Sequence, residues 1–221
     1  MAVLCPILDR HFHPNSYACR AGKGTHAASR RLQQLMRRYP FALHADIRQF
    51  FPSIDHDILK DTFRHRIKDR RLLTLLDRIV DGSNPQDPVN DYFPGDDLFS
   101  PWERPRGLPI GNLTSQWFAN WYLDAFDHTI TSVLGFGGYV RYCDDFVVFG
   151  NCRERLIELR HLIDQRLAGL RLKLHPRKTA IVPTQAGITF VGYRTWAHRR
   201  EVRGQSWWTR ANSRSMQCGF A

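Results

Sequence analysis

The chain has 221 residues, 43% of them hydrophobic and 24% charged, which indicates a globular protein of one domain or two closely joined subdomains. It has no apolar run long enough to cross a bilayer and no signal-peptide pattern, so we expect a cytoplasmic protein with no membrane partner. Five cysteines without CxxC spacing argue against a disulfide framework and a zinc site. The net charge of +11 favours nucleic acid as a partner, with a solvated basic surface as the alternative.

The first predicted element is a helix from Thr25 to about residue 39, which follows a basic, glycine-punctuated turn at residues 20–25. Thr25 is the expected cap of this helix. Residues 41–47 alternate between apolar and polar side chains, which is typical of a half-buried strand. Asp46 lies near the end of that strand, on the face opposite its apolar side chains.

Two amphipathic helices follow, the first capped by Ser53 or Asp55 and the second ending near Gly82. Residues 82–106 are rich in Pro, Gly and Asp, and they predict a solvated surface loop.

The second half of the chain predicts further helices and strands. Residues 114–134 are apolar nearly all round, which favours a buried helix. Residues 139–149 predict two short strands with two carboxylates at their bend. An amphipathic helix at 153–170 and strands at 180–183 and 188–193 complete a mixed pattern. This order favours an α+β fold with a sheet covered by helices on one face.

Three acidic residues occupy positions where carboxylates are costly. Asp46 ends an apolar strand, and Asp144 and Asp145 are adjacent beside another. Neighbouring carboxylates repel one another and are tolerated when a cation neutralises them. Mg²⁺ prefers oxygen ligands, and two ions about 4 Å apart stabilise both the attacking and the leaving oxygen of a phosphoryl transfer. An Asp-Asp turn joining two strands is the alternative reading of this pair.

The tetrapeptide Tyr-Cys-Asp-Asp at residues 142–145 resembles the YxDD box of reverse transcriptases. Other segments resemble further motifs of the same family, in the family's order. They are the fingers motif at 20–28, the two palm motifs at 45–54 and 107–116, and the two later motifs at 172–179 and 190–193.

The resemblance implies a right-hand polymerase palm with partial fingers, an antiparallel sheet covered by helices, and a thumb that is largely missing. Residues 1–40 would form the partial fingers, and residues 41–193 the palm, with fingers-like helices and a loop at 56–106. Residues 194–221, rich in Trp and Arg, would be a truncated or degenerate thumb; a nucleic-acid-contacting extension and a poorly ordered end are both open readings.

The resemblance also implies the catalytic groups. Asp46, Asp144 and Asp145, with the backbone carbonyl of Ile47, would bind two Mg²⁺ ions, for which Mn²⁺ could substitute. Lys178 matches the lysine that protonates the leaving pyrophosphate, and an ordinary surface lysine is the alternative.

The resemblance also implies which residues contact the substrate. Phe51 matches the bulky position that excludes a ribonucleotide, although Phe50 and Phe51 could both be core residues. Arg20 and Lys23 match positions near the triphosphate, where surface basic residues are the alternative. Three more residues are expected near the nucleotide or the primer end: Gln116, Tyr142 and Cys143. Gln116 and Ser115 could instead merely open a helix.

Ile110 stands where most reverse transcriptases carry glutamine, and residues 109–116 resemble the reverse transcriptases of diversity-generating retroelements. Those enzymes copy a template repeat RNA into cDNA, with errors at adenines. The implied partners are template RNA, a primer or cDNA strand, dNTPs and a small basic accessory protein. The alternatives are a group II intron or retron-type enzyme, a truncated non-catalytic RNA-binding remnant, and an RNA replicase, against which Phe51 argues.

Overall fold

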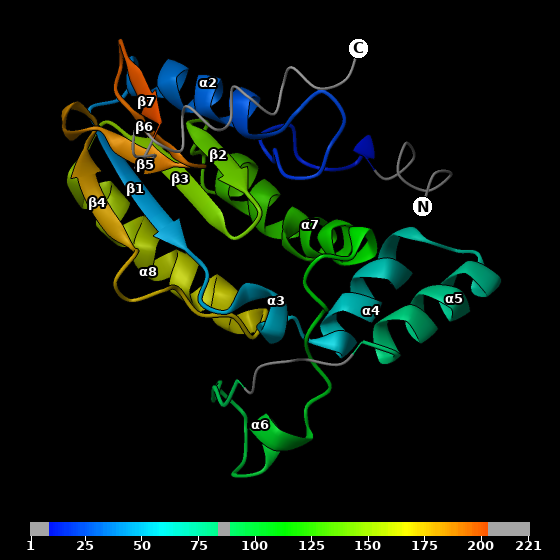
Figure 1. Ribbon diagram of the computed structural model, residues 1–221. Helices are drawn as coiled ribbons and strands as arrows, with labels where there is room; N and C mark the ends of the chain where they lie inside the picture. The colour runs from blue at the N-terminus through cyan, green and yellow to red at the C-terminus, as the bar shows by residue number, and fades with distance from the viewer. Residues whose placement is uncertain (1–8, 84–88, 203–221) are drawn as a thin grey trace, which may run out of the picture.

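A computed structural model describes residues 9–83 and 89–202 (Figure 1). Its centre is a four-stranded antiparallel sheet with the strand order β2-β3-β1-β4. The strands are β1 (Phe41–Asp46), β2 (Tyr139–Tyr142), β3 (Asp145–Gly150) and β4 (Ala180–Pro183). The predicted α+β class is therefore confirmed, whereas residues 203–221 of the predicted thumb remnant lie outside the described residues.

The alternation along β1 divides the sheet into two faces. Leu43, Ala45 and Ile47 are buried in the larger core, beneath helices α7 (Leu113–His128) and α8 (Arg153–Gly169). His44 and Asp46 face the other side, as the period of a strand requires. A five-residue π-helix (Thr129–Val133) continues directly from α7, so the predicted long helix is present with a changed final turn.

A helix also covers the opposite face, which the sequence did not predict. Helix α2 (Thr25–Met36) places Leu32 and Leu35 in a second core that includes Val140 and Val147 of the sheet (Figure 1). The residue that caps α2 is Gly24 rather than Thr25, at φ 98°. A glycine tolerates this backbone conformation, which a residue with a Cβ rarely adopts.

Three helices follow β1. A short turn, α3 (Phe50–Ser53), leads to α4 (His56–Arg66) and α5 (Arg70–Asp81), which pack together beside α7 (Figure 1). The Asp55 side chain accepts a hydrogen bond from the Ile58 amide at 3.0 Å, so Asp55 is the cap of α4.

The segment after α5 is not simply a solvated loop. Residues 89–106, which include the short α6 (Ser100–Glu103), are held to the palm by ion pairs. The Asp91 carboxylate accepts from Lys173 Nζ at 3.1 Å and also pairs with Arg48, while Asp96 pairs with Arg104. Only 13% of the Asp91 side chain and 8% of the Asp96 side chain are exposed. The predicted solvated loop is therefore wrong for these acids, because basic residues neutralise their charges where the side chains are largely buried. The partners of Asp91 are distant in sequence, whereas Arg104, the partner of Asp96, belongs to the same segment.

The single strand predicted at 188–193 is a hairpin. Strands β5 (Ile188–Phe190) and β6 (Tyr193–Thr195) turn at Val191 and Gly192, both with positive φ, and β7 (Arg200–Val202) completes a second sheet. A 3-10 turn (Thr184–Ala186) connects β4 to this sheet. Within residues 9–83 and 89–202, no helix has the length and apolarity needed to span a membrane.

Candidate active site

The three predicted carboxylates lie at one end of the central sheet. Asp46 and Asp145 are directly opposite each other in the antiparallel register of β1 and β3. The Ile47 amide donates a hydrogen bond to the Asp144 carbonyl at 3.1 Å. The structure thus brings together residues that are about a hundred positions apart in the chain, as the predicted site requires.

Two basic side chains accompany these carboxylates. Lys178 Nζ lies 3.1 Å from Asp46 Oδ2 and 3.3 Å from Asp46 Oδ1, so the predicted lysine belongs to this cluster. Its loop is anchored by the His175 amide, which donates to the Asp46 carbonyl at 2.7 Å. His44 Nε2 lies 2.7 Å from Asp145 Oδ1. Sequence reasoning missed His44, although its position two residues before Asp46 places both on one face of the strand.

The environment of the acidic bend disfavours the ionised forms of its carboxylates. Burial raises the pKa of Asp144, and the charges of Asp46 and Asp145 raise it further. Burial also raises the pKa of Asp145, an effect that the hydrogen bond from His44 opposes. A cation near these groups would relieve the repulsion and favour their ionised forms.

The side chains do not converge on a single point. Among residues 9–83 and 89–202, no three His, Cys, Asp or Glu side chains gather closely enough to hold a metal ion. Asp46 is engaged with Lys178, and Asp145 with His44. The oxygen donors suit Mg²⁺ in chemical type. To bind metal ions, however, these two carboxylates would have to exchange their present partners for the ions.

A cavity of about 460 Å³ opens beside the carboxylates. Its lining includes His44, Asp46, Asp145, Lys178 and Phe190 of β5. Pockets of roughly 300–1,000 Å³ are typical of small-molecule sites. The acidic cluster is therefore open to a ligand, and the second sheet supplies one wall of the cavity.

A buried ion pair supports the bend at residues 142–145. Arg141 Nη1 donates to the Cys143 carbonyl at 2.9 Å, and Cys143 adopts a left-handed backbone with φ 60°. Arg141 also forms a two-pronged pair with Asp127, at 2.7 and 2.6 Å, and Tyr139 donates to the same carboxylate at 2.6 Å. Sequence reasoning missed Arg141 and Asp127; a charged residue within the apolar strand before the bend was the available signal.

Tyr142 and Cys143, both half-buried in the bend, differ in their surroundings. Tyr142 packs against the second core, and burial raises the pKa of its hydroxyl. Cys143 packs against the larger core, and burial raises the pKa of its thiol to about 12. The Cys143 thiol is therefore protonated at neutral pH and acts as an apolar contact rather than a nucleophile.

The predicted triphosphate residues already have protein partners. Arg20 donates to Asp9 Oδ1 at 2.6 Å and to the His13 and Ser16 carbonyls, and only 6% of its side chain is exposed. Lys23 Nζ donates to the Pro14 carbonyl at 2.6 Å. In this arrangement both charges hold the segment before α2, so contact with a triphosphate requires their rearrangement.

The remaining predicted substrate residues lie in the two palm motifs, Phe51 in the first and Ile110 and Gln116 in the second. Phe50 is buried and Phe51 half-buried, so the two do not share one environment. They lie on the helical turn α3 and not on an extended chain. The Leu108 amide donates to the Phe51 carbonyl at 2.9 Å, which ties the two palm motifs together. Ile110 is 72% exposed, whereas Gln116 accepts a hydrogen bond from Cys19 Sγ.

Comparisons with known proteins bear on the family and the fold of the chain. The sequence profile of the reverse transcriptase (RNA-dependent DNA polymerase) family matches residues 1–195. A curated relative, Protein YkfC of Escherichia coli (strain K12), is 24% identical over 227 residues. The match covers 86% of this chain and 57% of YkfC, so the chain spans little more than half of that relative.

Solved structures show the same fold. The telomerase of Candida tropicalis in complex with the TWJ fragment of telomeric RNA aligns with a TM-score of 0.65 at 13% identity, over 91% of this chain and 36% of the telomerase. The telomerase of Candida albicans, also with the TWJ fragment, aligns with a TM-score of 0.58 at 14% identity, over 90% of this chain and 38% of that one. The match of the family profile over most of the chain means that this protein belongs to the reverse transcriptase family.

Proposed function

We propose that the protein is an RNA-directed DNA polymerase that extends a primer with dNTPs on an RNA template. The observation that carries this proposal is the register that sets Asp46 opposite Asp145, with Asp144 held beside Ile47. This juxtaposition occurs in a chain of the reverse transcriptase family, next to a cavity whose lining includes Asp46 and Asp145.

The residues that would hold two Mg²⁺ ions are Asp46, Asp144 and Asp145, with the Ile47 carbonyl as a further ligand. Bound there, such ions neutralise charge on the reacting phosphates and favour the deprotonated primer hydroxyl. Lys178 holds a proton on Nζ beside Asp46, where it can be given to the leaving pyrophosphate. His44 orients the Asp145 carboxylate through its hydrogen bond.

Other residues would bind and select the substrate. Phe51 would lie against the sugar and exclude a 2′-hydroxyl, and Tyr142 and Cys143 would support the primer end. Arg20 and Lys23 would contact the triphosphate after releasing their present partners. The RNA template is supported by the family and by the positive charge of the chain.

We assign the enzyme to the diversity-generating type on the basis of the sequence around Ile110. An isoleucine cannot donate the hydrogen bond of a glutamine, so the template and the nucleotide would be held less strictly. The exposure of Ile110 leaves it free to meet a substrate. Replacing Ile110 by Gln should lower errors at adenines in sequenced cDNA, and an unchanged error spectrum would reject this explanation.

One observation favours a second candidate, a non-catalytic RNA-binding remnant. Asp46 and Asp145 are paired with Lys178 and His44, and no three potential ligands gather in the described ranges. If these ion pairs persist in solution, the protein would retain its positive charge for RNA without turnover.

Primer extension on an RNA template with Mg²⁺ and dNTPs separates the two candidates. The polymerase should extend the primer, and Asp144→Ala should reduce the rate by about 10²–10³-fold or more, the scale of losing a main electrostatic contribution to the transition state. Asp164→Ala, at an exposed position of α8, is the matched control. A folded wild-type protein that binds RNA but does not extend the primer would support the remnant.

A further inference from the structure

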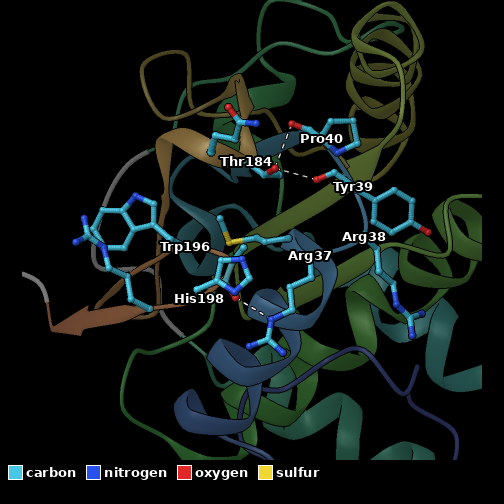
Figure 2. A pocket seen from close by; sticks show the side chains of 11 residues that line it. Arg37, Arg38, Tyr39, Pro40, Thr184, Trp196 and His198 are labelled. Atoms are coloured by element: carbon cyan, nitrogen blue, oxygen red, sulfur yellow. Dashed lines mark hydrogen bonds between the residues drawn. The ribbon is translucent and has the colours of Figure 1, made fainter.

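A second cavity lies at the opposite end of the central sheet from the carboxylates. Its volume is about 810 Å³, and it lies between the end of α2, the 3-10 turn after β4 and the loop from β6 to β7 (Figure 2). It adjoins the start of β1, whereas Asp46 is at the end of that strand. At about 3.4 Å per residue, the length of β1 separates the two sites by roughly 17 Å.

The lining of this groove is basic and aromatic. It includes Arg37, Arg38 and Arg199, which are exposed, and Tyr39 and Trp196, which are half-buried. None of the lining residues in the described part of the chain is acidic. The C-terminal end of α2 contributes a dipole equivalent to about half a negative charge. The three positive guanidinium groups outweigh it, so the groove is positively charged.

Hydrogen bonds hold the walls of the groove in place. Arg37 Nε donates to the Ala197 carbonyl at 2.8 Å (Figure 2), and Gln33, next to the groove on α2, donates to the Trp196 carbonyl at 3.2 Å. Thr184 closes the third side by donating to the Tyr39 carbonyl at 2.9 Å. The groove is therefore formed before any ligand arrives.

A stacked pair of side chains lies at one edge of the groove. The Arg199 guanidinium lies 4.2 Å from the centre of the Trp196 ring. Arg199 also pairs with Glu201, at 3.7 Å, but the pair is exposed and contributes little to stability. Guanidinium and aromatic planes stack on unpaired bases, while arginine side chains bind phosphates.

We infer that this groove binds a single-stranded segment of RNA outside the active site, an inference that rests on the proposed function. Arg37 and Arg38 would contact phosphates, and a base would stack on the Arg199–Trp196 pair. Stacking requires an unpaired base, so a single strand fits the groove better than a duplex. The site would hold the RNA at a distance from the reacting end.

Fluorescence anisotropy with a labelled single-stranded RNA tests the charge contacts. The double variant Arg38→Glu/Arg199→Glu should weaken binding by about tenfold or more, and it should reduce the salt-dependence slope by about 0.7, the value for the one phosphate contact that Arg38 would make to a single strand. The matched control Arg71→Glu/Arg160→Glu changes exposed arginines on α5 and α8 by the same total charge and should change binding less than about twofold. Equal weakening by the two double variants would overturn the inference.

The stacking contact has its own test. Trp196→Leu should weaken RNA binding by about 5- to 150-fold, whereas Trp102→Leu, at a 63% exposed tryptophan of α6, should leave it unchanged. Unfolding temperatures of each variant verify that the fold is intact. Tighter binding of a duplex than of a single strand would also contradict the inference.

Extension of a short, pre-annealed primer–template separates this inference from the proposed function. The Arg38→Glu/Arg199→Glu variant should extend it at the wild-type rate, because its carboxylates are untouched. A wild-type protein without extension activity would refute the proposed function, while the binding comparison would still decide the role of the groove.

Discussion

The Arg141–Asp127 pair shows at the scale of single residues how the acidic bend is held. Both side chains are almost completely buried, at 1% and 0% exposure, and Arg141 also reaches the backbone of Cys143. Burying two charges is costly unless each is paired and hydrogen-bonded. The pair therefore stabilises the bend only while it is complete.

Asp127→Asn should destabilise the protein by about 3–5 kcal/mol, because it leaves the Arg141 charge buried without its partner. Urea unfolding would measure the loss. Asp164→Asn, at an exposed position on α8, should change the free energy of unfolding by no more than about 0.5 kcal/mol. Combining Asp127→Leu with Arg141→Met should recover part of the loss; a double variant no more stable than Asp127→Asn would contradict this account.

His13, which lies near Asp127, should make the stability of the protein depend on pH. Burial lowers the pKa of His13 from its ordinary 6.5, and the nearby Asp127 partly opposes this effect. The unfolded chain therefore takes up the proton more readily than the folded one. The stability that neutral His13 contributes is present above pH 6.5 and is lost as the pH falls through the lowered pKa.

Urea midpoints measured from pH 7.5 down to pH 5 should fall for the wild type and fall less for His13→Gln. His161→Gln, at an exposed position of α8, is the control and should follow the wild type. Parallel pH curves for the wild type and His13→Gln would rule out this histidine as the cause.

At the scale of elements, the join between β4 and the second sheet depends on a glycine. Gly187 has φ 79° and ψ 142°, a conformation that is essentially restricted to glycine. A Cβ at this position would come within 2.5 Å of the Trp196 indole nitrogen. Backbone conformation and space thus both require glycine before β5.

Gly187→Ala should therefore destabilise the protein by about 1–3 kcal/mol through backbone strain, with a further cost from displacing Trp196. Gly192→Ala is the matched control, since Gly192 also has positive φ, at 82°, but a Cβ there would meet nothing within 4 Å. Thermal unfolding of both variants would check this. Equal losses would show that the contact with Trp196 adds nothing.

At the scale of the whole molecule, the proposed site requires β1, the bend before β3 and the loop before β4 to meet. Bound Mg²⁺ would stabilise only the structure in which they do so. At ten times its dissociation constant, an ion that binds only the folded state adds about 1.4 kcal/mol.

Adding Mg²⁺ should therefore raise the unfolding temperature of the wild type by a few degrees. The double variant Asp46→Asn/Asp144→Asn should show no such rise, and Asp164→Asn should respond as the wild type does. A rise of equal size in the double variant would place Mg²⁺ binding elsewhere. This measurement is independent of catalytic activity.

The sequence alone determined most of the elements and the chemical types of the residues at the proposed site. The period-two pattern of residues 41–47 and the adjacent acids at the bend are local features, because side-chain direction and turn preference act over a few residues. The same features placed Asp46 on the polar face of its strand and predicted the mixed fold.

Only the tertiary structure decided which of these side chains meet. The pairing of Asp46 with Lys178, the burial of Asp91, and the coverage of the second face by α2 each join residues from distant parts of the chain. Such contacts depend on packing and on charge neutralisation in three dimensions, and neither leaves a periodic signal in one segment. The same physics gives Arg20 a structural partner, Asp9, where the sequence suggested a ligand.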